Sequence, residues 1–163
     1  MDRDRRRFLA VAAGVGGTLA GCSSRRDGGL ELDALDVAGS PGGTVGVAPA
    51  ERVVVLDFFA TWCAPCEPQM DHLRRVRARF GEGTYLLSIS SEQDRDAVRS
   101  FWREHRGTWP VALDPDLRAT ERYGVRRLPT LLVLGPDGEE RWRHVGLAAD
   151  GRIRREIERA AGG

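Results

Sequence analysis

The sequence of 163 residues contains no lysine, so all of its 25 basic side chains are arginines. Acidic side chains number 24, and the formal net charge is only +1. Binding to nucleic acid depends on a surplus of basic side chains that neutralise phosphates. The near balance of charge therefore gives no reason to expect a nucleic-acid partner, and the missing lysine by itself indicates no function.

Cysteine is scarce as well, with Cys22, Cys63 and Cys66 as the whole set. A structural zinc site needs four ligands, usually arranged as two close pairs, and only one close pair of cysteines is present. The histidines are too far apart in sequence to supply the second pair: His72, His105 and His144. We therefore predict no metal site, and the odd cysteine, Cys22, needs its own explanation.

Long hydrophobic runs are missing too. The N-terminal apolar stretch, residues 8–20, would reach only about 20 Å as a helix, which is short of the ~30 Å hydrocarbon core of a bilayer. A permanent membrane-spanning helix is therefore not predicted. Arginines precede this stretch, and small residues followed by Cys22 come after it. That order of charged, apolar and cleavage regions is typical of an export signal.

Two shorter patterns lie within this signal. Arg5 and Arg6 open the sequence RRRFL, which resembles the twin-arginine export motif, although Asp4 stands where Ser or Thr is usual. Residues 19–22, LAGC, match the lipobox of bacterial and archaeal lipoproteins. The resemblance implies that Cys22 becomes the lipidated first residue. The alternative is an ordinary signal that happens to contain a cysteine.

Three parts of the chain are therefore predicted. Residues 1–21 form the export signal, residues 22–29 form a polar, glycine-rich lipidated tether, and residues 30–163 form the folded domain. We expect the protein on the extracytoplasmic face of the cell membrane, where the lipid anchors it.

The domain alternates strand and helix patterns. Residues 53–59, VVVLDFF, are almost continuously apolar, which predicts a central strand buried on both faces. The other predicted elements are a hairpin in 30–47, a helix over about 64–80, a strand over 84–90, helices over 94–106 and 114–124, a strand–turn–strand over 128–145, and a last helix from 150. This order predicts an α/β fold with a mixed central sheet flanked by helices.

Caps and core residues follow from the same patterns. Asp114 and Pro115 have the residue types of a helix cap and first position, and Asp150 is expected to cap the last helix. Three tryptophans are expected in the core: Trp102, Trp109 and Trp142.

Cys63 and Cys66 admit a structural or a chemical interpretation. A disulfide between them would close a ring of a few residues and so contribute little loop entropy. Cys63, however, lies where a buried strand meets a helix N-terminus, and unpaired N–H groups there favour an anion such as a thiolate. Pro65 suits a first helical turn. The position predicts redox chemistry, with Cys63 as an exposed attacking thiol and Cys66 as a sheltered resolving thiol.

These residues resemble the thioredoxin superfamily. LDFFATWCAPC, residues 56–66, resembles the family's active-site strand and turn, with Ala64 in place of a glycine. GVRRLPT, residues 124–130, resembles the segment that carries the family's cis-proline, here Pro129. The N-terminal hairpin and an αβ insertion over about residues 90–123 resemble the TlpA/ResA group of membrane-tethered thiol-disulfide oxidoreductases.

The resemblance implies roles for four further residues. Asp57 has apolar neighbours on both sides, so we expect it to be buried and to keep its proton; by resemblance it moves protons for Cys66. Pro129 is expected to be cis and to place backbone atoms beside Cys63, where an extended substrate can pair with them. Trp62 is either a core residue or a docking residue beside the thiol, and of the two positions we expect the surface; Leu128 is expected as an apolar neighbour of the disulfide.

A protein-disulfide reductase without a cofactor is therefore the predicted function, since the two sulfurs carry both electrons. By family analogy its electron donor is a membrane protein of the CcdA or DsbD kind. Its substrate remains open among apocytochrome c, a copper-site protein and misoxidised proteins. The alternatives are a Sco-like copper chaperone, for which His144 is a weak candidate ligand, and a disulfide-forming oxidase. The peroxiredoxin motif P-x-x-x-T-x-x-C is missing from the sequence.

Overall fold

Seven strands form one mixed sheet in the computed structural model, which describes residues 29–163. Their order across the sheet is β4-β1-β7-β6-β5-β8-β9. The strands are β1 (Glu31–Ala34), β4 (Thr44–Gly46), β5 (Val53–Phe59), β6 (Thr84–Ser90), β7 (Val111–Leu113), β8 (Thr130–Leu134) and β9 (Glu140–Val145). Cys22, Arg5 and Arg6, which carry the predicted anchor and export signal, lie outside the described residues.

Strand β5 lies inside the sheet, as its apolar sequence predicts. It pairs in parallel with β6 and antiparallel with β8, and all seven of its residues are buried. Both faces of the sheet are therefore covered at β5, which is why the strand shows no alternation of apolar and polar residues. Because β5 is hydrogen-bonded along both edges and packed on both faces, it fixes the position of the loop that follows it, residues 60–65.

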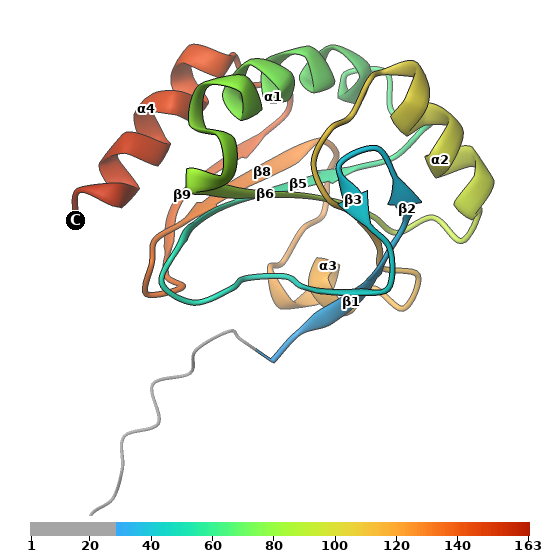
Figure 1. The fold of residues 1–163 in the computed structure, drawn as a ribbon, viewed down its shortest axis with the longest axis horizontal. Helices are drawn as coiled ribbons and strands as arrows, with labels where there is room; N and C mark the ends of the chain where they lie inside the picture. Colours follow the sequence, from blue (N-terminus) through green and yellow to red (C-terminus); the bar gives the residue numbers. More distant parts are fainter. Residues whose placement is uncertain (1–28) are drawn as a thin grey trace, which may run out of the picture.

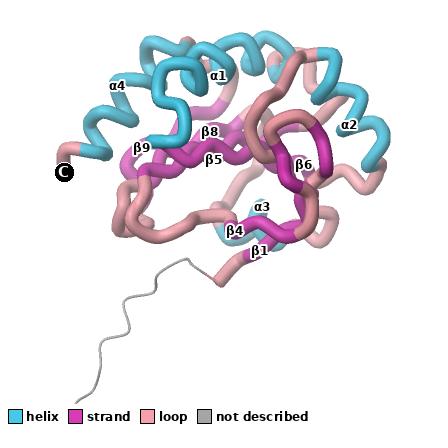
Figure 2. Tube along the Cα trace, viewed as in Figure 1, coloured by secondary structure: helices cyan, strands magenta, loops and turns pink. Residues whose placement is uncertain are grey.

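Helices cover the two faces unequally. The helices are α1 (Cys66–Phe80), α2 (Arg95–Glu104), α3 (Arg118–Arg122) and α4 (Asp150–Ala161), and a single 3-10 turn, η1 (Gly81–Gly83), follows α1. Figures 1 and 2 show α1, α2 and α4 on one side of the sheet and the short α3 on the other. Among the described residues, no helix is long and apolar enough to cross a membrane.

The core has one apolar cluster on each face of the sheet. Alternate residues of β5 divide between them: Val55 and Phe59 pack with side chains of α1, α2 and α4, whereas Leu56 and Phe58 pack with Ala119 of α3 and its surroundings. This division follows from the two-residue period of a strand. Cys63 and Cys66 belong to the cluster under α1.

The predicted N-terminal hairpin is confirmed. Strand β1 pairs antiparallel with β4, and a small inner pair, β2 (Asp36–Val37) with β3 (Ser40–Pro41), closes the turn between them. Strand β1 also pairs with β7, which attaches the hairpin to the main sheet. Residues 90–123 supply α2, β7 and α3, as the predicted αβ insertion requires. Strand β7 was not predicted from the sequence, because its three residues are too few to show the alternation of a strand.

Two predicted helix caps are corrected. Helix α3 begins at Arg118 rather than beside Pro115, because Leu117 has a left-handed φ of 59° that interrupts the chain before it. The Asp114 carboxylate still accepts hydrogen bonds from N–H groups in the first turn of α3, those of Ala119 (3.1 Å) and Thr120 (2.8 Å). Asp150 is the first residue of α4 rather than its cap, and its carboxylate faces His72 at 3.0 Å.

The tryptophans divide into two groups. Trp102 and Trp109 are fully buried, as predicted, and their rings meet edge to face at 5.0 Å. Trp142 is only half-buried, which corrects the prediction of a core position. It lies on β9, the edge strand, where its ring stacks on that of His144. The Arg152 guanidinium lies over the Trp142 ring in a cation–π contact. The Trp142 ring packs against the core cluster on the face covered by α1, α2 and α4 without being enclosed by it.

Candidate active site

Cys63 and Cys66 are joined by a disulfide, with their Cα atoms 5.3 Å apart. The turn that holds them is closed by two backbone hydrogen bonds, from the N–H of Cys63 to Ala60 O (3.2 Å) and from the N–H of Cys66 to Cys63 O (2.9 Å). Pro65 is the N-cap of α1, where the lack of an N–H costs nothing. The helix therefore begins at Cys66, two residues later than predicted, and Cys63 lies just outside it.

Both cysteines are buried, Cys66 at 1% exposure and Cys63 at 5%. The prediction of an exposed Cys63 is therefore corrected. Both residues are part of the apolar cluster between the sheet and α1, and that packing covers Cys63 on most sides. Its route to solvent is the cavity that it lines.

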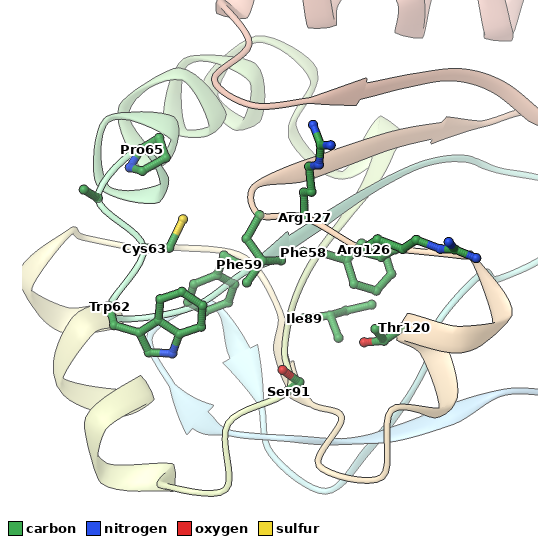
Figure 3. A pocket seen from close by; sticks show the side chains of 13 residues that line it. Phe58, Phe59, Trp62, Cys63, Pro65, Ile89, Ser91, Thr120, Arg126 and Arg127 are labelled. Carbon is green, nitrogen blue, oxygen red and sulfur yellow. The ribbon is translucent and has the colours of Figure 1, made fainter.

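This cavity has a volume of about 460 Å³ and opens beside the disulfide. Figure 3 shows Trp62 and Cys63 on the loop that leads into α1, with Arg126 and Arg127 across the cavity from them. Trp62 is 75% exposed, which confirms its predicted surface position. The lining consists of Phe58, Phe59, Trp62, Cys63, Ala64, Pro65, Ile89, Ser91, Thr120, Val125, Arg126, Arg127 and Leu128.

The segment before β8 forms the far wall of the cavity. Its Leu128–Pro129 peptide bond is cis, as the sequence resemblance implied, and Leu128 lines the cavity together with Cys63. Two hydrogen bonds hold the segment in place, from Thr130 Oγ1 to Arg127 O (2.7 Å) and from the N–H of Gly146 to Pro129 O (2.8 Å). The cavity is thus bounded by two fixed loops, each attached to a central strand.

Asp57 is buried in the middle of β5, at 1% exposure. Ser88 Oγ donates a hydrogen bond to its Oδ2 (2.7 Å), and Trp109 Nε1 donates one to Ser88 Oγ (2.9 Å). Burial raises the pKa of Asp57 to about 7, against the opposing effect of the Ser88 hydrogen bond. Neither cause is a neighbouring charge, so the shift results from loss of solvent.

The hydrogen bonds also distinguish the two oxygens of Asp57. Ser88 Oγ accepts a hydrogen bond from Trp109 and donates one to Asp57 Oδ2. Asp57 Oδ1 has no hydrogen-bond partner among residues 29–163. Oδ1 is therefore the oxygen whose hydrogen-bonding capacity is unused. Strand alternation puts the Asp57 side chain on the same face as Val55 and Phe59, the face that packs with Cys66.

Two further side chains fix the loops around the disulfide. Glu92 accepts hydrogen bonds from the N–H (2.8 Å) and the hydroxyl (2.7 Å) of Thr61, directly before Trp62. Gln69 on α1 exchanges two hydrogen bonds with the backbone of Ala148, before α4. Neither residue was predicted from the sequence, nor was Ser88, because the contacts Thr61–Glu92, Gln69–Ala148 and Asp57–Ser88 each join positions 31 or more residues apart.

The histidines take structural positions. His72 faces Asp150 at the start of α4, and His144 stacks on Trp142 and contacts the Leu147 carbonyl. Neither residue lines the Cys63 cavity. Within residues 29–163, no group of three or more histidine, cysteine, aspartate or glutamate side chains is placed to hold a metal ion.

Comparisons with known proteins agree with this geometry. A model of the Redoxin family matches residues 34–158. The thiol-disulfide oxidoreductase ResA of Bacillus thuringiensis (strain Al Hakam) is 31% identical over 87 residues, which are 53% of this chain and 50% of that protein. ResA of Bacillus subtilis (strain 168) is 29% identical over the same length. The chain thus spans about half the length of the curated relatives that it matches.

Solved structures share the fold at lower identity. A thiol:disulfide interchange protein DsbE from Chlorobium tepidum superposes with a TM-score of 0.68 at 23% identity, covering 80% of this chain and 96% of that chain. The exposed lipoprotein thioredoxin of Streptococcus pneumoniae (strain TIGR4) gives 0.68 at 22% identity, with 80% and 98% covered. At such identities the likeness concerns the fold alone, and it confirms the predicted thioredoxin-like architecture.

Proposed function

The chain belongs to the Redoxin family, and we propose that it is an extracytoplasmic thiol-disulfide oxidoreductase that reduces disulfide bonds in other proteins. The observation that carries the proposal is the Cys63–Cys66 disulfide at the start of α1, with Cys63 at the wall of an open cavity. The likeness to ResA proteins of Bacillus, which are named thiol-disulfide oxidoreductases, supports it.

The reaction uses the two sulfurs of the reduced protein. The Cys63 thiolate attacks one sulfur of a substrate disulfide, which forms a mixed disulfide and releases the other substrate sulfur as a thiolate. The Cys66 thiolate then attacks Cys63, releases the reduced substrate and closes the Cys63–Cys66 disulfide. Two electrons pass to the substrate, two protons are taken up by its thiolates, and no cofactor is needed.

Asp57 is proposed to take the proton of Cys66. A thiol must lose its proton before it attacks, and Cys66 is too deeply buried to give that proton directly to water. With a pKa of about 7, the Asp57 carboxyl exchanges protons readily at neutral pH. Its unpaired Oδ1 is the atom that receives the proton.

Stoichiometry tests the proposed reaction. Protein reduced with dithiothreitol and then freed of reductant should convert one disulfide of a test peptide into two thiols for each Cys63–Cys66 disulfide that forms. Thiol titration and intact mass together measure both changes. Reduced peptide without the matching protein disulfide, or no reduction of any disulfide, would refute the activity.

The direction of electron flow is predicted to be reductive. Protein groups that stabilise a thiolate make a disulfide more oxidising. Ala64 and Pro65, between the cysteines, carry no charge or side-chain donor, and Leu128 is apolar. Arg126 and Arg127 line the same cavity, but both guanidinium groups extend away from Cys63 (Figure 3). We therefore expect a potential nearer the thioredoxin value of about −270 mV than the DsbA value of about −120 mV.

Equilibration of the purified protein against dithiothreitol redox buffers measures this potential, with the oxidised fraction read from mass after alkylation. A midpoint close to that of DsbA would instead assign the chain to the disulfide-forming oxidases. In the reductive case a membrane electron donor of the CcdA or DsbD kind is proposed to regenerate the dithiol. Apocytochrome c or a copper-site protein is the proposed substrate class.

Lipid anchoring through Cys22 is proposed for the cellular location. The LAGC sequence supports it, and the pneumococcal structural neighbour is described as an exposed lipoprotein. Cys22→Ser should move the protein from the membrane fraction to the soluble fraction or block its processing, because no acceptor remains for the lipid. Cell fractionation and the N-terminal mass measure this. Unchanged fractionation without a lipid mass would contradict the anchor.

Export by the twin-arginine route is proposed separately. Replacing Arg5 and Arg6 by lysine keeps the positive charge and removes the twin arginine, so export should stop while a general secretory signal would be little affected. The matched control is Arg3→Lys, which lies before the motif. Normal export of the double variant would assign the general secretion route.

A further inference from the structure

The side chains of Arg126 and Arg127 have no partner among residues 29–163, and among the unpaired arginines of the described residues these two line the cavity that contains Cys63. Several other exposed arginines are paired with nearby carboxylates, such as Arg141 with Asp137, and Arg143 with Glu140. Both Arg126 and Arg127 are exposed, on the segment between α3 and β8. Two adjacent unpaired cations beside a reactive disulfide are available to an outside partner.

Arg126 and Arg127 both line two neighbouring cavities. On one side is the cavity of about 460 Å³ with Cys63 and the exposed Trp62. On the other is a smaller cavity of about 220 Å³, which Arg126 and Arg127 line together with Gly124, Thr130, Arg143 and Val145. None of the residues described as lining either cavity is acidic. The result is one surface that passes from apolar at Trp62 to cationic at Arg126 and Arg127, which we call the arginine surface.

We propose that the arginine surface binds an extended acidic segment of the substrate protein, next to the cysteine that Cys63 attacks. This inference rests on the proposed reductase function and adds the charge of its substrate. Apolar substrate atoms beside the disulfide pack against Trp62 and Leu128, and an aspartate or glutamate a few residues away pairs with Arg126 or Arg127. Both guanidinium groups extend away from Cys63 in Figure 3, toward flanking positions of a bound chain rather than toward its sulfur.

Charge complementarity favours an acidic segment as the ligand of the arginine surface. Residues 22–28, which precede the domain after the predicted cleavage, contain Arg25, Arg26 and a single acidic residue, Asp27, so they supply no acidic segment for the arginine surface. An acidic segment gains two ion pairs where neither cation has to give up an existing partner. Contacts of this kind mainly accelerate encounter and select between substrates.

Matched peptides test the proposal. Two peptides carry the same disulfide and differ only in having three glutamates or three glutamines within six residues of the reactive cysteine. The reduced protein should reduce the glutamate peptide about 3- to 10-fold faster at low salt, and 0.5 M NaCl should remove most of the difference. The double variant Arg126→Gln/Arg127→Gln should lose the preference, and Arg126→Glu/Arg127→Glu should favour a third peptide that carries lysines.

Arg155→Gln is the control, because Arg155 is exposed on α4, has no partner among the described residues and lines neither cavity. It should keep the wild-type preference. Equal rates for the two peptides, with normal reduction of a small neutral disulfide, would overturn the inference and leave the reductase function intact. Failure to reduce any disulfide would overturn both. Inhibition that grows with protein concentration, with dimers in sedimentation, would assign the surface to a second copy and also overturn the inference.

Discussion

Cys66→Ser is expected to leave the protein covalently attached to its substrates through Cys63. Cys63 borders the cavity, so it is the sulfur that an incoming disulfide reaches, whereas Cys66 is the first residue of α1 and is 1% exposed. Without the second thiol the mixed disulfide has no internal attacker, and multiple turnover should fall at least about 100-fold. Non-reducing gels after acid quenching in cells measure the trapped adducts.

Cys63→Ser is the matched control, because it removes the other sulfur with the same atom change. It should lose turnover to the same degree and should trap no adducts, since Cys66 has no open route to a large substrate. In the reduced wild type, Cys63 should be the first thiol to react with iodoacetamide. Faster alkylation of Cys66, or adducts that form through Cys66 in Cys63→Ser, would reverse the two roles.

The second large effect concerns Asp57 and the pH dependence of stability. The pKa of Asp57 is raised from 3.8 to about 7 in the folded protein. A raised carboxyl pKa favours the folded state fully below the unfolded pKa, and this contribution is lost as pH rises toward the folded pKa. A shift of about three pH units corresponds to roughly 4 kcal/mol. The free energy of unfolding should therefore fall by about that amount between pH 3.5 and pH 8, relative to Asp57→Asn.

Urea unfolding of the oxidised protein measures this difference, since cysteines in a disulfide do not titrate. The other carboxylates are common to both proteins, so the comparison with Asp57→Asn isolates Asp57. Ser88→Ala should raise the pKa of Asp57 further, because the Ser88 hydrogen bond lowers it. The free energy of unfolding of this variant should therefore go on falling to a higher pH than that of the wild type. Parallel pH profiles for wild type and Asp57→Asn would show that the carboxyl is not held neutral.

Much of this site could be predicted from short stretches of sequence. The apolar run of β5, the helix that begins at Cys66 and the two-residue spacing of the cysteines are local features, because each depends on neighbours within one or two turns of chain. The same holds for the cis bond before Pro129, which was inferred from a seven-residue segment. Burial of Asp57 also followed, since an apolar run flanks it on both sides.

Tertiary structure decided the partners of these residues. Ser88 on β6 bonds Asp57, Trp109 before β7 bonds Ser88, and Arg126 and Arg127 line the Cys63 cavity from the far side of the insertion. Such contacts join positions 21 to about 60 residues apart, and no periodicity or local spacing encodes them. The predicted exposure of Cys63 was wrong because it depends on packing against distant residues. The predicted start of α3 was wrong because Leu117 has a left-handed φ that no local pattern indicates.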